Sequence, residues 1–356
     1  MDKDGRGHGA GKLAGRHSDS PPRLSLVDTR RKIEIQEEAE LRRTSPMAAV
    51  AMLVSTLLVC AFFALDRTGH LSEASSYLAG MEAFSLRALL LYGLLPLVTA
   101  SIMMAIYKPS LRLLAGTRPP IPVILAAPAA GFFAGWLVWC SVELALSLAP
   151  SWEKWLAIPL IWRAGKLYMD QAPLFGFLTF LAAAILPASS HQLLYRGIIQ
   201  PFYMAGDRRL YRSIVPALLA AAVSLDPPGL AVLIIFSLLT SWARLASRSL
   251  FASSLLSAGF AVAMLLGRSL FGLLNEAIFK MPLIDPLSIR IFLVTMISAL
   301  LVLLLAPLAL TGMPARREKA GGAVGKKSET RPFRLANRII GLLCLGGLAL
   351  CLYFLA

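Results

Sequence analysis

The sequence predicts an all-α, polytopic membrane protein with about nine transmembrane helices, and composition, run length and charge placement support this. Of the 356 residues, 57% are hydrophobic and only 15% are charged, and the mean hydropathy is +0.69. Soluble domains carry about a quarter charged residues, so a soluble globular class is excluded. The apolar residues gather in runs of roughly 20, the length at which a helix crosses the hydrocarbon layer. The net charge of +15 falls in the tails and loops between the runs.

Nine runs are expected to cross the membrane in turn. They are Met47–Leu65, Phe84–Tyr107, Ile121–Leu148, Ala172 to about Tyr195, Ser213–Leu225, Leu230–Ala243, Leu250–Leu266, Ile291–Leu310 and Ile339–Ala356. The fifth run is short, and Asp226-Pro-Pro-Gly229 ends it because proline cannot continue a helix. Between the third and fourth runs, the tryptophan-rich piece Trp152–Trp162 is expected at the headgroup level. In the third run, Gly131-x-x-x-Gly135 predicts a close contact with another helix.

Polar segments divide the chain into four parts. Residues 1–45 are predicted to be a disordered, basic cytoplasmic tail without the apolar core of a signal peptide. Residues 46–312 form the predicted transmembrane bundle, residues 313–338 a flexible basic cytoplasmic linker, and residues 339–356 a C-terminal transmembrane helix.

Basic and less basic loops alternate along the chain, which predicts its orientation. Under the positive-inside rule, the alternation puts the amino terminus in the cytoplasm of a cell with an inner membrane, although Lys154 near Trp155 fits it poorly. The basic loops also predict contact with anionic lipid headgroups. No basic-aromatic module accompanies the charge, so no nucleic-acid partner is expected. The four cysteines have no metal-type spacing, and no metal or other cofactor is expected.

The stretch ILPASSHQLLYRGIIQPF, residues 185–202, carries the strongest functional signal. His191 and Gln192 lie in an otherwise apolar helix that is expected to end at Tyr195-Arg196-Gly197. Polar groups are costly inside a membrane segment, so such positions are candidate functional sites. The stretch resembles the first signature of the CPBP family of intramembrane proteases, which includes the bacterial CAAX-type proteases. The family usually has Glu-Glu-x-x-Phe-Arg-Gly here, so His191 and Gln192 stand at its two acidic positions.

A second stretch, from Leu239 to Ser257, is similar to the last signature of the same family. Counting from Ser249-Leu-Phe251 puts the family's histidine on Ser257 and its asparagine on Ala261, which are four residues apart and therefore on one helix face. The family's middle histidine falls on Ser224, with Asp226 as the alternative. The resemblance covers residues 172–266.

The resemblance implies that His191, Gln192, Arg196, Ser224 and Ser257 surround a site for peptide cleavage inside the membrane. Such a reaction needs a general base and a group that stabilises the oxyanion. The family's acidic, histidine and asparagine positions are all substituted here, and one histidine is too few ligands for a metal. We therefore expect a pseudoprotease that binds a membrane protein or a lipidated peptide.

Two other functions stay open at this point. The first is an active intramembrane endopeptidase that uses His191 or an atypical site, and the second is a small transporter or channel subunit with Glu143 and His191 along a polar path. Arg196, at the expected helix end, also fits a residue that extends to the headgroups. Glu276 is expected beside Asn275 in a solvated loop.

Overall fold

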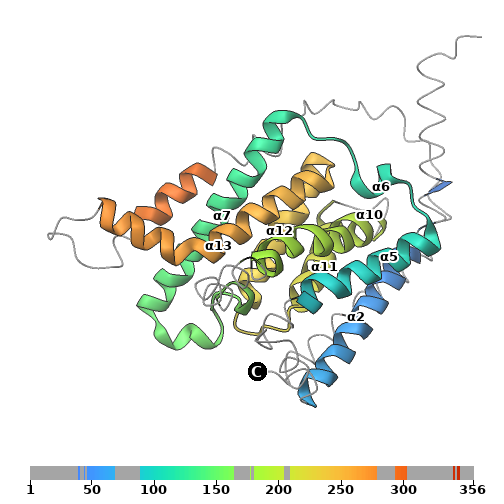
Figure 1. Ribbon diagram of the computed structural model, residues 1–356, viewed down its shortest axis with the longest axis horizontal. Coiled ribbons are helices and arrows are strands. Elements are labelled where there is room, and N and C mark those ends of the chain that lie inside the picture. Colours follow the sequence, from blue (N-terminus) through green and yellow to red (C-terminus); the bar gives the residue numbers. More distant parts are fainter. Residues whose placement is uncertain are drawn as a thin grey trace, which may run out of the picture. The chain divides into compact units, whose positions relative to one another are not determined.

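The computed structural model describes residues 39–40, 44, 46–68, 89–163, 177, 180–203, 209–278, 293–302, 340 and 343–344. The chain divides into two compact units, Met1–Glu40 and Leu41–Ala356, and all elements named below belong to the second. Within the described ranges every element is a helix, and the one β-type contact is an isolated bridge between Gly116 and Ser249. The predicted all-α class is confirmed (Figure 1).

The helices follow one another in the order that the apolar runs predict. They are α2 (Pro46–Arg67), η1 (Leu89–Leu94), α5 (Leu95–Tyr107), α6 (Leu111–Ala115), α7 (Ile121–Leu148), η2 (Pro150–Lys154), η3 (Leu181–Ile185), η4 (Pro187–His191), η5 (Leu193–Ile199), α10 (Gln200–Phe202), α11 (Arg209–Ala222), α12 (Leu230–Ser247) and α13 (Leu250–Ile278). Residues 293–302 are also helical. Helix α7 has the predicted bounds of the third run.

Five stretches of the described helices are long and apolar enough to cross a membrane. They are Pro46–Leu65, Leu89–Tyr107, Ile121–Leu148, Leu230–Ser247 and Leu250–Leu273. The chain is thus a multi-pass membrane protein. The count of nine stays a prediction, because much of the eighth and ninth runs, the linker and the tail lie outside the described residues.

Helices α7 and α13 cross with their backbones in close contact. Each residue of the predicted small-residue pair lies against the backbone of α13: a Cβ on Gly131 would collide with the Leu256 carbonyl, and one on Gly135 would lie 2.6 Å from the Phe260 oxygen. On the other side of the crossing, Gly259 leaves room for the Pro128 carbonyl. The predicted close contact is confirmed, and its partner is α13.

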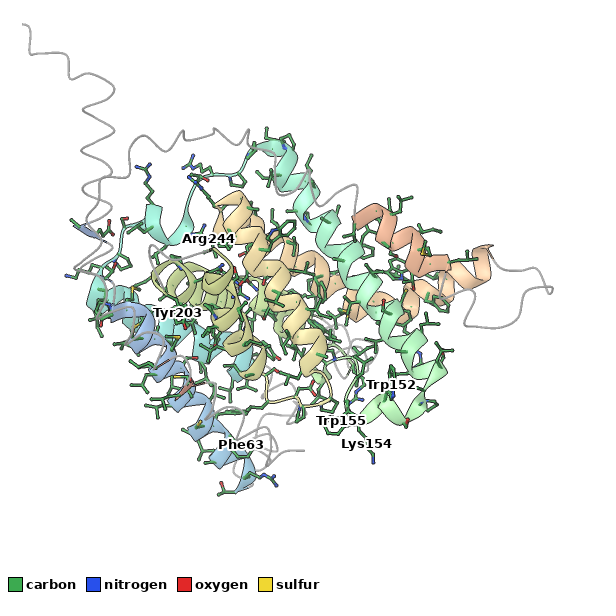
Figure 2. The ribbon with its side chains drawn as sticks, turned by 180° about the vertical axis from the view of Figure 1, so that it is seen from behind. Phe63, Trp152, Lys154, Trp155, Tyr203 and Arg244 are labelled. Atoms are coloured by element: carbon green, nitrogen blue, oxygen red, sulfur yellow. The ribbon has the colours of Figure 1, made fainter. Side chains whose placement is uncertain are left out.

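Two pairs of the described loops are held together by hydrogen bonds. In the first pair, Arg244 of α12 donates hydrogen bonds to three carbonyls of α6, and the Thr117 amide donates to the Arg248 carbonyl at 3.0 Å. In the second pair, the Ala157 amide donates to the Pro228 carbonyl at 2.9 Å. Figure 2 shows Arg244 far from Trp152 and Trp155. The predicted basic loops 108–118 and 244–248 are therefore neighbours, and so are the less basic loops near Trp155 and Pro228.

Two expectations about where helices end are wrong. Helix α13 continues to Ile278, because its apolar residues keep a helical pattern past Leu266, so Asn275 and Glu276 lie in a helix and not in a loop. The helix of the first signature does not end at Gly197 but continues to Phe202.

Trp162 is buried inside the bundle, so its side chain does not extend toward headgroups. Its side chain is 1% exposed, its indole N–H donates to the Ala183 carbonyl at 3.1 Å, and its ring packs on Phe236 and Phe260. Only Trp152 and Trp155, which are 55% and 76% exposed, fit the expected interfacial position.

Candidate functional site

The helix that carries the first signature is wound mainly as a π-helix. Three π-segments, η3, η4 and η5, follow one another between Leu181 and Ile199, with α-helical dihedral angles at the linking residues Leu186 and Gln192. A π-turn pairs residues five apart, so it brings side chains at i and i+5 close to one face. Such turns are rare and occur often at functional sites. Here the π-winding contains His191 and Arg196, which are five residues apart.

Arg196 is fully buried, and its guanidinium points at α12. Its Nη2 donates to the Ser237 carbonyl at 2.6 Å and to the Thr240 hydroxyl at 3.2 Å, and its Nε donates to the same hydroxyl at 3.3 Å. Its Nη1 has no hydrogen-bond partner among the residues that the structure describes. The interpretation of Arg196 as a residue that extends to the headgroups is wrong, because the helix continues beyond it and no part of it is exposed.

Gln192 joins the first signature to the second. Its side chain is 1% exposed, and its Nε2 donates to the Ser257 hydroxyl at 3.3 Å. Its Oε1 accepts from the Ser253 hydroxyl at 3.4 Å, and Ser253 also donates to the Thr240 carbonyl at 2.9 Å. Two of the positions implied by the family resemblance are thus in direct contact. Ala261, one turn beyond Ser257, is fully buried and adds no polar group.

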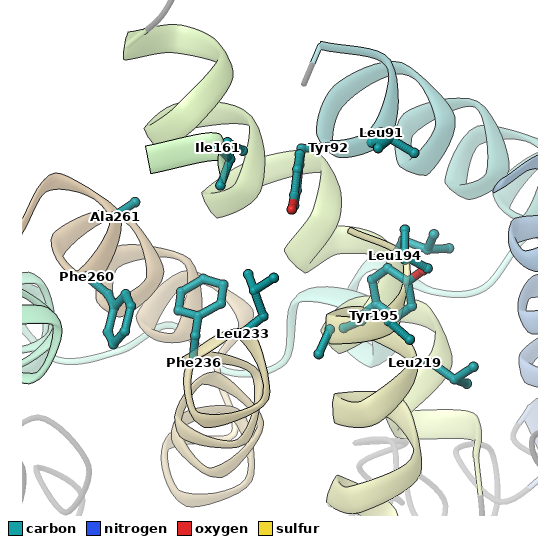
Figure 3. Close-up of a cluster of buried hydrophobic side chains, with 14 of the residues drawn as sticks. Leu91, Tyr92, Ile161, Leu194, Tyr195, Leu219, Leu233, Phe236, Phe260 and Ala261 are labelled. Atoms are coloured by element: carbon teal, nitrogen blue, oxygen red, sulfur yellow. The ribbon is translucent and has the colours of Figure 1, made fainter. Parts of the chain in front are cut away.

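His191 lies beside this contact, between two tyrosine rings. Its ring centroid is 4.6 Å from that of Tyr195 and 5.8 Å from that of Tyr92, and the side chain is 2% exposed. Neither ring nitrogen has a partner of good hydrogen-bond geometry within the described ranges, although the Ala220 backbone is a polar neighbour. Figure 3 shows Tyr92 and Tyr195 on facing helices of this buried cluster.

Ser224 reaches the site only through Tyr92. Its hydroxyl donates to the Ala221 carbonyl at 2.6 Å and is a hydrogen-bonding neighbour of the Tyr92 hydroxyl, whose ring contacts His191. No hydrogen bond joins it to Gln192 or Ser257 among the bonds of the described residues.

Asp226, the alternative to Ser224, holds a turn together. Its Oδ2 accepts from the Leu160 amide at 2.6 Å, and its Oδ1 accepts from the Gly229 amide at 3.3 Å. Burial raises the pKa of this carboxyl, while the two amides and Arg163 act in the opposite direction. Both oxygens are used by the backbone, so Asp226 has a structural position.

Sequence reasoning missed most of the polar side chains around Arg196. We call the whole set the polar seam, and its members are Gln192, Arg196, Gln200, Ser237, Thr240, Ser241, Ser253 and Ser257. Two sequence signals were available: Gln192, Arg196 and Gln200 are spaced by four, and so are Ser249, Ser253 and Ser257. Repeated spacing by four marks a polar stripe on one helix face, and here all of these residues are buried.

Glu143 lies apart from the seam. It is partly buried on α7, and the charge of Arg268 on α13 acts on it. Across the described segments no group of three His, Cys, Asp or Glu side chains is placed to hold a metal.

The comparisons with known proteins agree with this geometry. A family model described as type II CAAX prenyl endopeptidase Rce1-like matches residues 173–263. Residues 173–263 are therefore similar to the Rce1-like endopeptidases. This Rce1-like segment spans η3 to the first half of α13 and contains every residue of the polar seam, so the resemblance predicted from the two signatures is confirmed. The searches of curated proteins and of solved structures found no match.

Proposed function

We propose that this protein is a non-catalytic relative of the CPBP intramembrane proteases that binds a membrane protein or a lipidated peptide. One observation carries the proposal: Gln192, at a position where the family has an acid, is held by Ser257 and Ser253 in a network of neutral groups. An amide cannot accept a proton usefully, and the pKa of an alcohol is too high for it to act alone as a base.

The seam and the surface around it suit a helix-binding role. The seam joins η5, α12 and α13 into one unit. Large apolar side chains remain exposed on α12 and α13, among them Trp242 at 51% and Phe251 at 52%. In a bilayer such faces contact either lipid or another transmembrane helix.

Anionic headgroups are the second expected partner. Arg112, Arg118 and Arg248 are exposed around the junction of α6 with the loop after α12, where hydrogen bonds hold the two segments together. Each basic residue near an anionic surface contributes about 1 kcal/mol of attraction. We assign this end to the cytoplasmic side of an inner membrane.

Labelling of single cysteines tests this orientation. In a variant without native cysteines, Arg248→Cys should react with an impermeant thiol reagent only from the cytoplasm. Glu153→Cys, at the other end of α7, should react only from outside. If both cysteines react from the same side of the membrane, the proposed orientation is excluded.

The second candidate function is an intramembrane endopeptidase with His191 as its base. The ring nitrogens of His191 favour it, because they have no partner of good hydrogen-bond geometry in the described part of the chain and a neutral imidazole is able to accept a proton. Its burial between Tyr92 and Tyr195 counts against it, because a general base needs a path for water.

The experiment that separates the two functions scores cleavage and retention of one co-expressed membrane partner together. Loss of a general base lowers the rate by roughly 10² to 10⁴, so an enzyme would lose cleavage in His191→Ala. The proposed binder should retain the uncleaved partner in both the wild type and His191→Ala. Cleavage by the wild type that disappears in the variant would overturn the proposal.

A further inference from the structure

The polar seam contains a buried positive charge that has no negative partner among the residues that the structure describes. Arg196 is 0% exposed, and its partners are a serine carbonyl and a threonine hydroxyl, which are both neutral. A charge out of water is stable only when it is paired and hydrogen-bonded. The Nη1 nitrogen, with two N–H groups, is left without a partner in the described part of the chain.

His191 supplies a second donor on the same side of the helix. The π-winding brings residues five apart near one another, and the Arg196 charge acts on the His191 ring. A neutral imidazole carries one N–H, and that of His191 has no partner of good geometry in the described ranges. The two side chains therefore offer N–H donors and one positive charge within the same buried cluster.

We propose that Arg196 and His191 bind a carboxylate. The positive charge selects an anion, and a single charge selects a monovalent one, because a divalent phosphate would leave a second buried charge uncompensated. A carboxylate has two acceptor oxygens, which match one donor on each side chain. The inference goes beyond the binding function proposed above and does not depend on it.

The position of Gln192 sharpens the inference. Gln192 precedes Arg196 by four residues, and its amide is held by Ser257 and Ser253. The signature that it resembles has an acid at this position, so this chain lacks the carboxylate that such a sequence would carry near Arg196. With an amide there, the carboxylate has to come from a small free anion or from a side chain or terminus of a bound partner.

Thermal unfolding of the purified full-length protein in detergent tests the site with sodium formate as the probe. Ionic strength is kept constant with sodium chloride. Formate at ten times its dissociation constant should raise the Tm of the wild type by roughly 2 °C, and the rise should saturate. His191→Phe keeps an aromatic ring beside Tyr195 and removes the donor, so it should weaken formate binding about tenfold.

Gln192→Glu is the decisive variant, because it changes no side-chain volume. It should raise the Tm of the formate-free protein and remove the saturable response to formate, and Arg196→Gln should remove the response as well. An equal rise in the wild type and in Gln192→Glu would be a general salt effect and would overturn the proposal. No response in the wild type, or a lower Tm in Gln192→Glu, would overturn it also.

A second arm identifies the source of the carboxylate. If it belongs to a partner, Gln192→Glu should reduce retention of that partner at least tenfold, and formate should compete with the partner in the wild type. If it is a free anion, retention should not change while the formate response of the protein alone persists. Because the formate titration needs no partner, it stands even if the binding function fails.

Discussion

The two sides of helix α13 pack in opposite ways. Toward α7, Gly259 and the facing Gly131 and Gly135 let the backbones touch, and the atoms nearest to these glycines are mainly backbone carbonyls. Toward η5 and α12, Ser253 and Ser257 form hydrogen bonds inside the bundle. The first side leaves no room for one methyl group. On the second side, polar atoms of Arg196 and Gln200 have no hydrogen-bond partner among the described residues.

This difference separates stability from function within one helix. In a membrane, close packing of small residues drives helix association, while a hydrogen bond between helices contributes only about 0.6 kcal/mol on average. The glycine side is therefore expected to hold the bundle together. The polar side costs stability, and a cost of that kind is retained where it serves binding or chemistry.

The largest effect is expected at the glycine crossing. Gly131→Ala places a Cβ against the Leu256 carbonyl, and a backbone atom cannot move aside as a flexible side chain does. We expect a loss of about 3 kcal/mol, the upper end for overpacking. The measurement is the Tm and the yield of monodisperse protein in detergent.

Gly272→Ala is the matched control, because nothing lies within 4 Å of a Cβ at that position of α13. An alanine there should be neutral or should stabilise the helix by roughly 0.5–1 kcal/mol. Equal destabilisation by both variants would show that the α7–α13 crossing is not special.

The next effect contrasts buried Arg244 with exposed Arg248, at the end of the same helix. Arg244 donates to the carbonyls of Leu113, Leu114 and Ala115, so Arg244→Gln should cost about 2 kcal/mol and release α6. Trypsin should then cleave faster between residues 108 and 118. Arg248→Gln, with an exposed side chain, should leave the rate unchanged. An unchanged rate in Arg244→Gln would mean that α6 is held by other contacts.

A smaller effect is expected inside the polar seam. A double-mutant cycle with Gln192→Ala and Ser257→Ala should give a coupling energy of about 0.6 kcal/mol, the average for a hydrogen bond between membrane helices. The measurement is unfolding in detergent of the two single variants and the double variant. A coupling above about 2 kcal/mol would remove the contrast between the two sides of α13.

The smallest effect concerns the turn at Asp226. Burial raises its pKa above the ordinary value of 3.8, so its contribution to stability is present below that value and is lost as the pH rises through the raised pKa. The Tm difference between the wild type and Asp226→Asn should therefore shift against the wild type as the pH increases. Glu153→Gln, at an exposed position, is the control for the general effect of removing one carboxyl group. A trend of the opposite sign would mean that the two amides outweigh burial.

Much of the fold could be predicted from the sequence, because hydropathy and the residues that begin or end a helix are local properties. The run from Ile121 to Leu148 is one helix with the predicted bounds, and the glycine spacing at Gly131 and Gly135 marks a close contact. Hydropathy does not show where an apolar helix ends, so the extension of α13 to Ile278 was missed. Composition also favoured an interfacial position for Trp162, whose burial depends on Phe236 and Phe260 from distant parts of the chain.

The sequence predicted several residues of the site, but few of the hydrogen bonds between them. The two signatures indicated Gln192 and Ser257, which are hydrogen-bonded. They gave no indication that Thr240 would be the common partner of Arg196 and Ser253, because that depends on how α12 is rotated against two other helices. The catalytic or binding role of these positions stays a prediction.

The most direct test of the central claim is a count of new peptide termini in membranes, because it needs no known partner. Membranes from cells that produce the wild type, His191→Ala or no copy of the protein are digested, and termini inside transmembrane segments are compared by mass spectrometry. A non-catalytic binder predicts the same set of termini in all three. A terminus that is present with the wild type and absent with His191→Ala would contradict the account.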